Sequence, residues 1–342
     1  MTESRHPLRI GIAGLGRLGR RHALNLARHV PGAELRRACS ADEQDRAFAN
    51  ETLGIPRFDT DFEALLHDPH LDAIVLATPT ALHADQVIAV LNAGKHVFVE
   101  KPLALDIEAC ERVQAVGQQH PKQIAMVGFV RRFDTSYQHA QQQLASGALG
   151  RPFLVRSQTC DRNDPSGFFV NYAGQSGGIF MDCSVHDIDL ARWFLGNPKA
   201  TRAFASGTIA SHAGLRQYQD VDNGLAIVEF QDGSRAVFYA SRTFAHGHET
   251  QTEIIATEGK LLIGHGAARD RVVTSDAQGV RYQSTTDFYE RFSDAFLQEM
   301  QHFVGACRGD HPPALTLADA SEATRIGLAI TQSLHSGNPV DI

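Results

Sequence analysis

A glycine-rich turn separates the first apolar segment of the chain from its first amphipathic one. The apolar segment 8–13 predicts a strand, residues 17–30 predict a helix, and residues 14–19 are Gly-Leu-Gly-Arg-Leu-Gly. In this context the first glycine permits a tight turn, the second lets the backbone approach a pyrophosphate, and the third lets the helix lie close to the sheet. We therefore expect a dinucleotide site formed by Gly14, Gly16, Arg17, Leu18 and Gly19.

Short apolar runs alternate with helical patterns through the first third of the chain. The next strands are expected at 35–39, 73–77 and 97–99, and the next helices at 42–53 and 80–91. Such alternation predicts right-handed crossovers and a doubly wound parallel sheet. We expect an NAD(P)-binding Rossmann domain over residues 1–125.

The pattern changes from about Met126. Helices are expected at 140–149, 178–194, 288–307 and 317–334, and β-rich segments run from 201 to 282, interrupted by Asp232-Gly233, Glu258-Gly259 and Gln278-Gly279. Turns of this kind between apolar runs indicate hairpins. The sequence thus predicts an α/β protein whose second domain, residues 126–342, is α+β with a large, mostly antiparallel sheet. We assign that domain to substrate binding and oligomerisation, and leave open whether the last helix packs back on the first domain.

Composition excludes several classes of partner. The net charge of the 342 residues is −7 and no basic run is present, so we expect no nucleic-acid partner. No stretch approaches the roughly 20 apolar residues of a membrane span, and residues 1–7 lack the apolar core of a signal peptide. The five cysteines are widely spaced and predict reduced, buried thiols. We therefore expect a cytoplasmic protein without a membrane partner.

The end of the second strand bears on the choice of coenzyme. NAD sites usually place a carboxylate there to bind the ribose hydroxyls. In this chain Ser40 holds that position and Asp42 follows two residues later, with no arginine directly after Ser40 to bind a 2′-phosphate. We expect NAD, held in part by Ser40 and Asp42, and leave NADP open.

Two further segments carry groups suited to acid–base chemistry. Lys101, in Glu100-Lys101-Pro102, follows a predicted strand at the edge where parallel sheets bind ligands. Asp182, His186 and Asp189 would share one face of a helix at i, i+4 and i+7, so that a carboxylate could orient the imidazole. Taken alone, the lysine is better explained as a solvated side chain beside a loop proline, whereas on spacing alone a surface Asp–His helix pair and a catalytic one remain equally open.

Together these segments resemble a known family. The glycine turn, Ala77-Thr78-Pro79-Thr80 with His83, residues 93–97 (Ala-Gly-Lys-His-Val), Glu100-Lys101-Pro102, residues 128–134 (Gly-Phe-Val-Arg-Arg-Phe-Asp) and the 177–193 segment occur in the order typical of the glucose–fructose oxidoreductase and inositol dehydrogenase family (Gfo/Idh/MocA). The resemblance covers nearly the whole chain and is nearest the myo-inositol 2-dehydrogenase branch.

The resemblance implies a role for each segment. Lys101, Asp182 and His186 would be catalytic: His186 would take the hydroxyl proton as hydride leaves for the nicotinamide, Asp182 would orient it, and Lys101 would polarise the substrate oxygen. Further cofactor contacts would come from Thr78, Pro79, Thr80, His83, Glu100 and Lys101, and substrate contacts from Lys101, Arg131, Asp161, Asn163, Asp182, His186, Asp189 and His248. Relatives also have a cis Lys–Pro bond at this motif in many cases, and many are homotetramers.

Two departures from the family pattern concern the substrate. Asp161 stands where inositol dehydrogenases tend to carry a histidine, and His246-Gly247-His248 replaces a tyrosine-rich segment. Because altered hydroxyl-binding groups redirect specificity, we predict oxidation of a secondary alcohol on a cyclitol or sugar without naming it. The alternatives are an NAD-dependent glycosidase of the same family and a nucleotide-sensing regulator without catalysis. We expect no metal, because His246, His248 and His265 lack zinc-ligand spacing.

Overall fold

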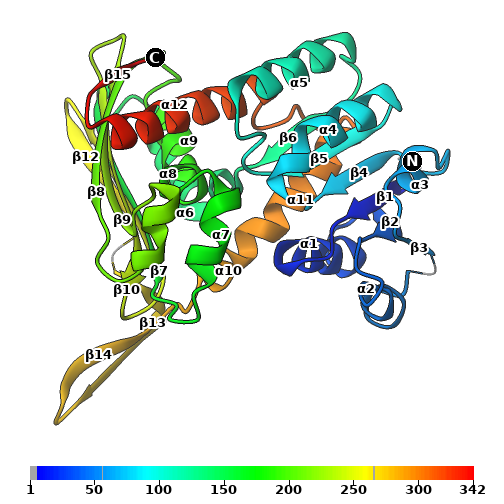
Figure 1. The fold of residues 1–342 in the computed structure, drawn as a ribbon, viewed down its shortest axis with the longest axis horizontal. Helices are drawn as coiled ribbons and strands as arrows, with labels where there is room; N and C mark the ends of the chain where they lie inside the picture. Colours follow the sequence, from blue (N-terminus) through cyan, green and yellow to red (C-terminus); the bar gives the residue numbers. More distant parts are fainter. Residues whose placement is uncertain (1–5, 56, 265) are drawn as a thin grey trace. The chain divides into compact units, whose positions relative to one another are not determined.

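The computed structural model describes residues 6–55, 57–264 and 266–342, and its elements are drawn in Figure 1. Contacts between residues divide it into two compact units. The first extends to Val130 and includes residues 294–321, and the second comprises residues 131–293 and 322–342. Residues 1–5 of the polar start and His265 lie outside the described residues.

The first unit is built on a six-stranded parallel sheet with the order β3-β2-β1-β4-β5-β6. The predicted doubly wound sheet is therefore confirmed, and its strand order reverses between β1 and β4, the crevice where such sheets bind nucleotides. β4 is buried along its whole length, which explains its continuous apolar sequence. The strands are β1 Leu8–Ala13, β2 Ala33–Cys39, β3 Arg57–Asp59, β4 Ala73–Leu76, β5 His96–Glu100 and β6 Ala125–Gly128.

Helices lie on both faces of this sheet (Figure 1). They are α1 Arg17–Arg28, α2 Asp45–Ala47, the π-helix Phe48–Thr52, α3 Glu63–Leu66, the 3-10 turn Thr80–Leu82, α4 His83–Asn92, α5 Ile107–Gln119 and α11 Ser293–Cys307. The helix expected at 42–53 begins three residues later and continues as a π-helix. β3, α3, α5 and β6 were not predicted; both strands and α3 are only three or four residues long.

The second unit contains a seven-stranded mixed sheet with the order β12-β11-β7-β10-β9-β8-β15. Only β7 and β10 pair in parallel, so the predicted mostly antiparallel sheet is confirmed. The three predicted turns each join neighbouring antiparallel strands. The strands are β7 Pro152–Arg162, β8 Ala200–Thr208, β9 Asn223–Phe230, β10 Arg235–Phe244, β11 Glu249–Ala256, β12 Gly259–Ile263 and β15 Val340–Asp341, with a separate hairpin of β13 Ala268–Asp276 and β14 Gly279–Ser284.

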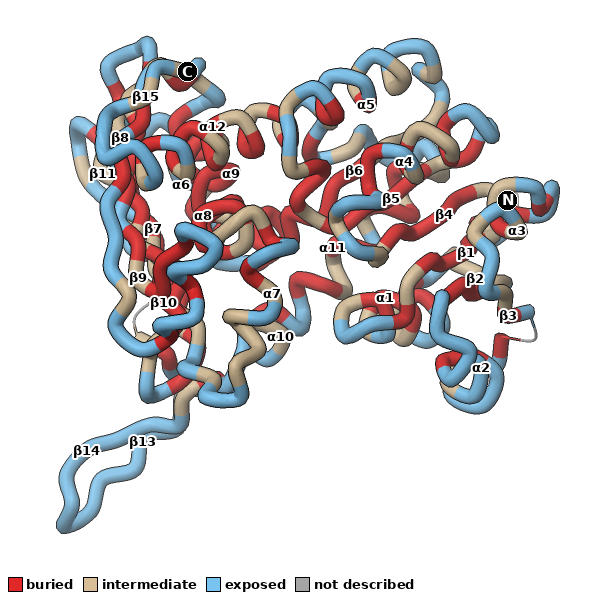
Figure 2. The backbone as a smooth tube through the Cα atoms, viewed as in Figure 1, coloured by how far each residue is buried: buried red, intermediate tan, exposed pale blue. Residues whose placement is uncertain are grey.

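Helices cover one face of the mixed sheet, and its strands alternate between buried and exposed residues. They are the 3-10 turn Val130–Phe133 at the boundary, α6 Thr135–Ala145, α7 Phe168–Ser176, α8 Ile179–Asp182, α9 Val185–Phe194, the 3-10 turn Ala213–Tyr218, α10 Phe288–Arg291 and α12 Leu317–Ser336. Figure 2 shows buried residues along the strands of this sheet, interspersed with exposed ones, and a β13–β14 hairpin that is mostly exposed.

Helix boundaries differ from those predicted where capping was overlooked. The helix expected at 140–149 begins at Thr135, because Asp134 accepts hydrogen bonds from the backbone N–H groups of Ser136 and Tyr137. The single helix expected at 178–194 is two helices, α8 and α9, interrupted at Cys183 and Ser184. The helix expected at 288–307 is likewise interrupted at Phe292.

All five cysteines are free thiols, and all but Cys307 are buried, as expected. Burial raises the pKa of the Cys39 thiol to about 11. None of the helices within the described residues combines the length and apolar content needed to cross a bilayer.

Candidate active site

The glycine turn has the geometry of a dinucleotide cradle. Gly14 has φ +89°, and a Cβ there would lie 2.4 Å from the carbonyl oxygen of Ala77. A Cβ at Gly19 would lie 2.0 Å from the carbonyl oxygen of Gly14, so the helix approaches the turn closely. Gly16 is exposed, and a Cβ added there would meet no described atom within 4 Å. The N-terminus of α1 is therefore open to an anion, and the residues present fit a pyrophosphate.

The end of β2 places Ser40 beside a carboxylate that the sequence did not single out. The Ser40 hydroxyl donates to the Asp45 carboxylate at 2.6 Å and accepts from the backbone N–H of Asp42 at 3.3 Å. Asp45 also accepts from the half-exposed Arg20 at 2.7 Å. Arg20 is thus already neutralised by Asp45, which favours ribose hydroxyls over a 2′-phosphate as the group bound here.

His83 links two of the predicted cofactor-binding segments. Its ring is 1% exposed, with Nε2 2.8 Å from the carbonyl oxygen of Thr78 and Nδ1 2.8 Å from that of Pro102. Burial lowers the pKa of His83 despite these two acceptors. Thr78 in turn donates its hydroxyl hydrogen to Gln86 at 2.6 Å, while Pro79 is exposed. His83 therefore holds the turns after β4 and β5 together through their backbones.

Lys101 follows β5 at the carboxyl edge of the parallel sheet. Its side chain is half-buried, and the Lys101–Pro102 bond is cis, as the family resemblance implied. The backbone N–H of Lys101 donates to Oε2 of Glu100 at 3.2 Å. Glu100 is buried, and its carboxylate contacts the His22 ring as well as this backbone N–H.

Asp182 and His186 lie on opposite sides of the break between α8 and α9. Asp182 is the last residue of α8, and His186 belongs to the first turn of α9. Both side chains are half-buried. The single continuous helix is therefore a wrong expectation, although both residues occur in the second unit, four positions apart.

A buried arginine anchors Asp182. Arg242 on β10 is fully buried and donates to Asp182 at 3.1 Å and to Asp220 at 3.2 Å. Burial alone would lower the pKa of Arg242, but the neighbouring Cys183, Asp182 and Asp220 raise it above its ordinary value. The guanidinium thus stays charged and holds the Asp182 carboxylate in place.

The two positions that depart from the family pattern contact each other. Nδ1 of His248 on β11's amino-terminal side lies 2.9 Å from a carboxylate oxygen of Asp161 on β7. The other Asp161 oxygen accepts from the Cys183 thiol at 3.5 Å. Burial alone would raise the pKa of Asp161, but the His248 hydrogen bond and the Arg242 charge hold it below its usual value. Asp161, Asp182, Cys183, Arg242 and His248, the polar group of the second unit, therefore form one connected arrangement.

Of the remaining residues predicted to bind substrate, two are buried in ion pairs and one is exposed. Arg131 is buried and donates to Asp187 at 2.8 Å and to Thr159 at 2.7 Å. Asp189 is buried and accepts two hydrogen bonds from Arg132, at 2.8 and 2.6 Å. Asn163 is exposed just beyond β7.

Sequence reasoning missed Arg242 and Asp220, although a signal was present. Along β10 the inward positions are Ala236, Phe238 and Ala240, and Arg242 continues that alternation. A cation at an inward strand position requires a buried acid. The sequence does not show which acids pair with Arg242, because Asp182 and Asp220 come from distant segments.

Comparison with known proteins identifies the class. Residues 8–129 match the family model described as oxidoreductase family, NAD-binding Rossmann fold, and residues 137–262 match the GFO/IDH/MocA C-terminal domain. The chain belongs to the Gfo/Idh/MocA oxidoreductase family.

Similar proteins within the family act on inositols. The chain is 39% identical to the scyllo-inositol 2-dehydrogenase (NAD(+)) of Bacillus subtilis, over 98% of this chain and 97% of that protein. It is 31% identical to the myo-inositol 2-dehydrogenase of Thermotoga maritima, over 98% of both. The crystal structure of scyllo-inositol dehydrogenase from Lactobacillus casei with bound NAD(H) and scyllo-inositol superposes with a TM-score of 0.94 at 36% identity, covering 98% of this chain and 99% of that one.

Proposed function

We propose that the chain is an NAD-dependent dehydrogenase that oxidises a secondary hydroxyl group of an inositol, with scyllo- and myo-inositol as the first candidates. The observation that carries this proposal is the likeness, along 98% of the chain, to a Lactobacillus casei enzyme whose structure holds NAD(H) and scyllo-inositol together. The open turn at Gly16 and the polar group of the second unit supply the two kinds of site that such a reaction needs.

The proposed roles of the catalytic residues follow from their chemistry. His186 accepts the proton of the reacting hydroxyl, since a neutral imidazole is the base whose ordinary pKa lies nearest neutrality. Asp182, held by Arg242 at 3.1 Å, orients that imidazole. Lys101 donates a hydrogen bond to the substrate oxygen and stabilises the negative charge that develops there. NAD, when bound, supplies the acceptor for the hydride that leaves the same carbon.

Asp161 and His248 are proposed to bind substrate hydroxyls. An ionised carboxylate only accepts hydrogen bonds, so Nδ1 of His248 carries the hydrogen in its contact with Asp161. Nε2 of His248 is buried and has no hydrogen-bond partner among the described residues. That nitrogen is suited to a substrate hydroxyl, and Asn163 offers a second polar group from the exposed end of β7. Arg131 and Asp189, both in buried ion pairs, would act by holding their segments in place.

Initial rates with a panel of inositol isomers and hexoses, each with NAD and with NADP, test the proposal. Accumulation of NADH with at least one inositol, at a higher kcat/KM for NAD than for NADP, is the expected result. Cleavage of a glycoside without net NADH would instead establish the family's glycosidase chemistry. Nucleotide binding without turnover of any polyol would establish a sensor.

The finer expectations on assembly and location belong to the same proposal. On the exposed face of the mixed sheet, Phe204, Ile227 and Val237 align across β8, β9 and β10. Phe204 and Ile227 are 41% and 46% exposed, and exposed apolar rows of this kind commonly mark self-association surfaces. We propose a cytoplasmic homotetramer. Light scattering at micromolar concentration should give four chains, and fewer in Ile227→Lys; a monomeric wild type would refute the assembly, and cell fractionation tests the location.

A further inference from the structure

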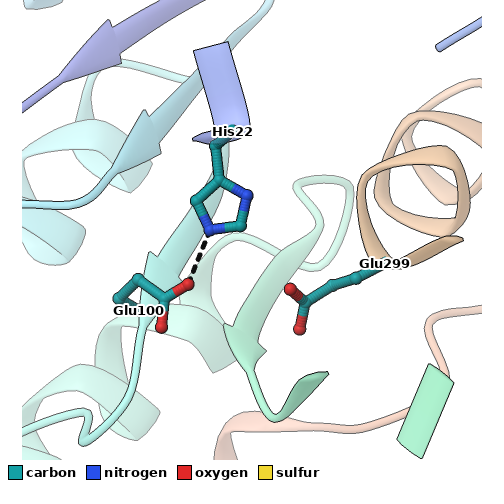
Figure 3. A group of neighbouring side chains, drawn as sticks. All are labelled: His22, Glu100 and Glu299. Atoms are coloured by element: carbon teal, nitrogen blue, oxygen red, sulfur yellow. Dashed lines mark hydrogen bonds and ion pairs between the residues drawn. The ribbon is translucent and has the colours of Figure 1, made fainter. Parts of the chain in front are cut away.

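A second titratable cluster lies in the first unit, apart from the glycine turn. His22 on α1, Glu100 at the end of β5 and Glu299 on α11 are all buried, and one ligand-type atom from each lies within 4.8 Å of the others. Figure 3 shows the three side chains converging from separate elements. Their positions, 22, 100 and 299, are too far apart in sequence for a motif to reveal them.

Glu100 has partners for both of its carboxylate oxygens. Oε1 lies 2.6 Å from Nε2 of His22, and Oε2 accepts from the backbone N–H of Lys101 at 3.2 Å. On β6, a Cβ at Gly128 would come within 3.0 Å of the Glu100 carboxylate, so the glycine makes room for it. The His22 ring, the backbone N–H of Lys101 and a close-packed strand therefore hold the Glu100 carboxylate in a fixed position.

Glu299 differs in every one of these respects. It is 0% exposed, its carboxylate points toward His22 and Glu100, and neither of its oxygens has a hydrogen-bond partner among the described residues. Burial, together with the negative charge of Glu100, raises the pKa of Glu299 well above its usual value. A second ionised carboxylate in this place would be both unsolvated and repelled.

The surroundings of the cluster are apolar. The His22 ring meets Phe98 and Phe296 edge-on, with centroid distances of 5.3 and 5.7 Å. Among the described residues, the His, Cys, Asp and Glu side chains that group with Glu299 are His22 from α1 and Glu100 from β5, while β6 places the uncharged Gly128 against Glu100. Either a proton or a cation must therefore neutralise the second carboxylate.

We propose that Glu299 is a protonated carboxylic acid in the folded protein and that it forms, with His22 and Glu100, a positioning unit that holds the backbone at Lys101. The unit ties α1, β5 and α11 together behind the residue that carries the proposed hydrogen bond to substrate. The positioning role rests on the proposed function, whereas the protonation of Glu299 does not.

Thermal unfolding of Glu299→Gln against pH tests the protonation. Between the ordinary glutamate pKa and the raised one, the folded wild type binds more protons than the unfolded chain, so its stability falls as pH rises. Glutamine copies the shape of the protonated acid and does not titrate. The Tm of Glu299→Gln relative to wild type should therefore increase from pH 5 to pH 9, by roughly 2 °C or more. The exposed Glu51→Gln should show no such trend.

A pH-independent Tm difference, or a Glu299→Gln variant that does not fold, would overturn the protonation. So would one equivalent of metal per chain in the purified wild type that Glu299→Gln loses, because the cluster would then be a metal site. Elemental analysis of both proteins decides this point.

Steady-state kinetics test the positioning role separately. Glu100→Gln should lower kcat about 10–100-fold with a small change in the KM for substrate, because a displaced catalytic group costs rate rather than binding. The exposed Glu51→Gln should keep its kcat within about twofold. An unchanged kcat in Glu100→Gln would overturn positioning. If Lys101→Met also keeps full activity, the proposed catalytic role of Lys101 is wrong. The pH dependence of the Tm of Glu299→Gln would still test whether Glu299 is protonated.

Discussion

The candidate binding regions of the two units are built from different parts of the chain. In the first unit the cradle for the dinucleotide is backbone: a positive φ at Gly14, an open Gly16 and the N-terminus of α1. In the second unit the polar group is made of charged side chains, with Arg242 as the anchor of Asp182. A backbone site depends on contiguous residues and tolerates many side chains, whereas a side-chain site depends on pairs from distant strands and on the charge balance among them.

The largest expected effect on activity comes from the two side chains proposed to act on the reacting hydroxyl group. His186→Asn removes the base, and Lys101→Met removes the donor to the substrate oxygen, so each should lower kcat/KM about 10²–10⁴-fold. NAD affinity, measured by fluorescence titration, should change little in His186→Asn. Exposed His139→Asn and Lys122→Met serve as controls and should retain wild-type rates. Full activity in both test variants would remove the catalytic assignment.

Removal of Arg242, which holds Asp182 in the second unit, should lower the free energy of unfolding by an amount similar to the loss of transition-state stabilisation in those variants. Arg242→Met leaves Asp182 and Asp220 without their buried counter-charge, and loss of one partner of a buried pair costs about 3–5 kcal/mol. On the same strand, Arg235 is 41% exposed and pairs with Glu229 at 3.6 Å, so Arg235→Met should cost about 0–1 kcal/mol. Urea unfolding measures the free energy of unfolding of both variants. Equal losses would mean that the buried ion pairs of Arg242 stabilise the fold no more than the exposed pair of Arg235.

The same contrast explains what could be predicted from the sequence. Periodicity and turn residues predicted the parallel sheet, the hairpins and the cradle, since each depends on neighbours in sequence. The break between α8 and α9 was missed, because nothing in Cys183-Ser184 stops a helix and both residues have helical backbone angles. The Asp161–His248 contact joins residues 87 positions apart, and Glu299 joins its cluster from the far end of the chain. Contacts between such distant residues can be identified only once the fold is known.

Substitutions at two glycines of the cradle should affect stability and NAD binding separately. Gly14→Ala places a Cβ at φ +89°, 2.4 Å from the Ala77 carbonyl oxygen, and should destabilise the protein by at least about 1–2 kcal/mol. Gly16→Ala meets no described atom within 4 Å, so its Tm should stay close to wild type. Its KM for NAD should rise roughly tenfold, or 1.4 kcal/mol, because the methyl group lies where the pyrophosphate approaches. An unchanged KM would mean that the nucleotide binds elsewhere.

The smallest effect concerns the pH dependence of the polar group. His248 and Arg242 hold the pKa of Asp161 below its usual value, after the opposing effect of burial. Asp161 therefore stabilises the fold above the unfolded pKa of about 3.9 and loses that contribution as pH falls through the folded pKa. The Tm gap between wild type and Asp161→Asn should narrow as pH falls from 6 to 3. Exposed Asp341→Asn is the control, and a gap that widens on acidification would contradict the charge assignment.

Isotope transfer tests the central claim most directly. The purified protein is supplied with NAD and scyllo-inositol that carries deuterium on its ring carbons, and the reduced coenzyme is analysed by mass spectrometry. Direct hydride transfer predicts one deuterium in each reduced nicotinamide, formed in equal amount to the ketone, and neither product in His186→Asn beyond a trace. Unlabelled NADH, or no reduction of NAD with any inositol, would contradict the account.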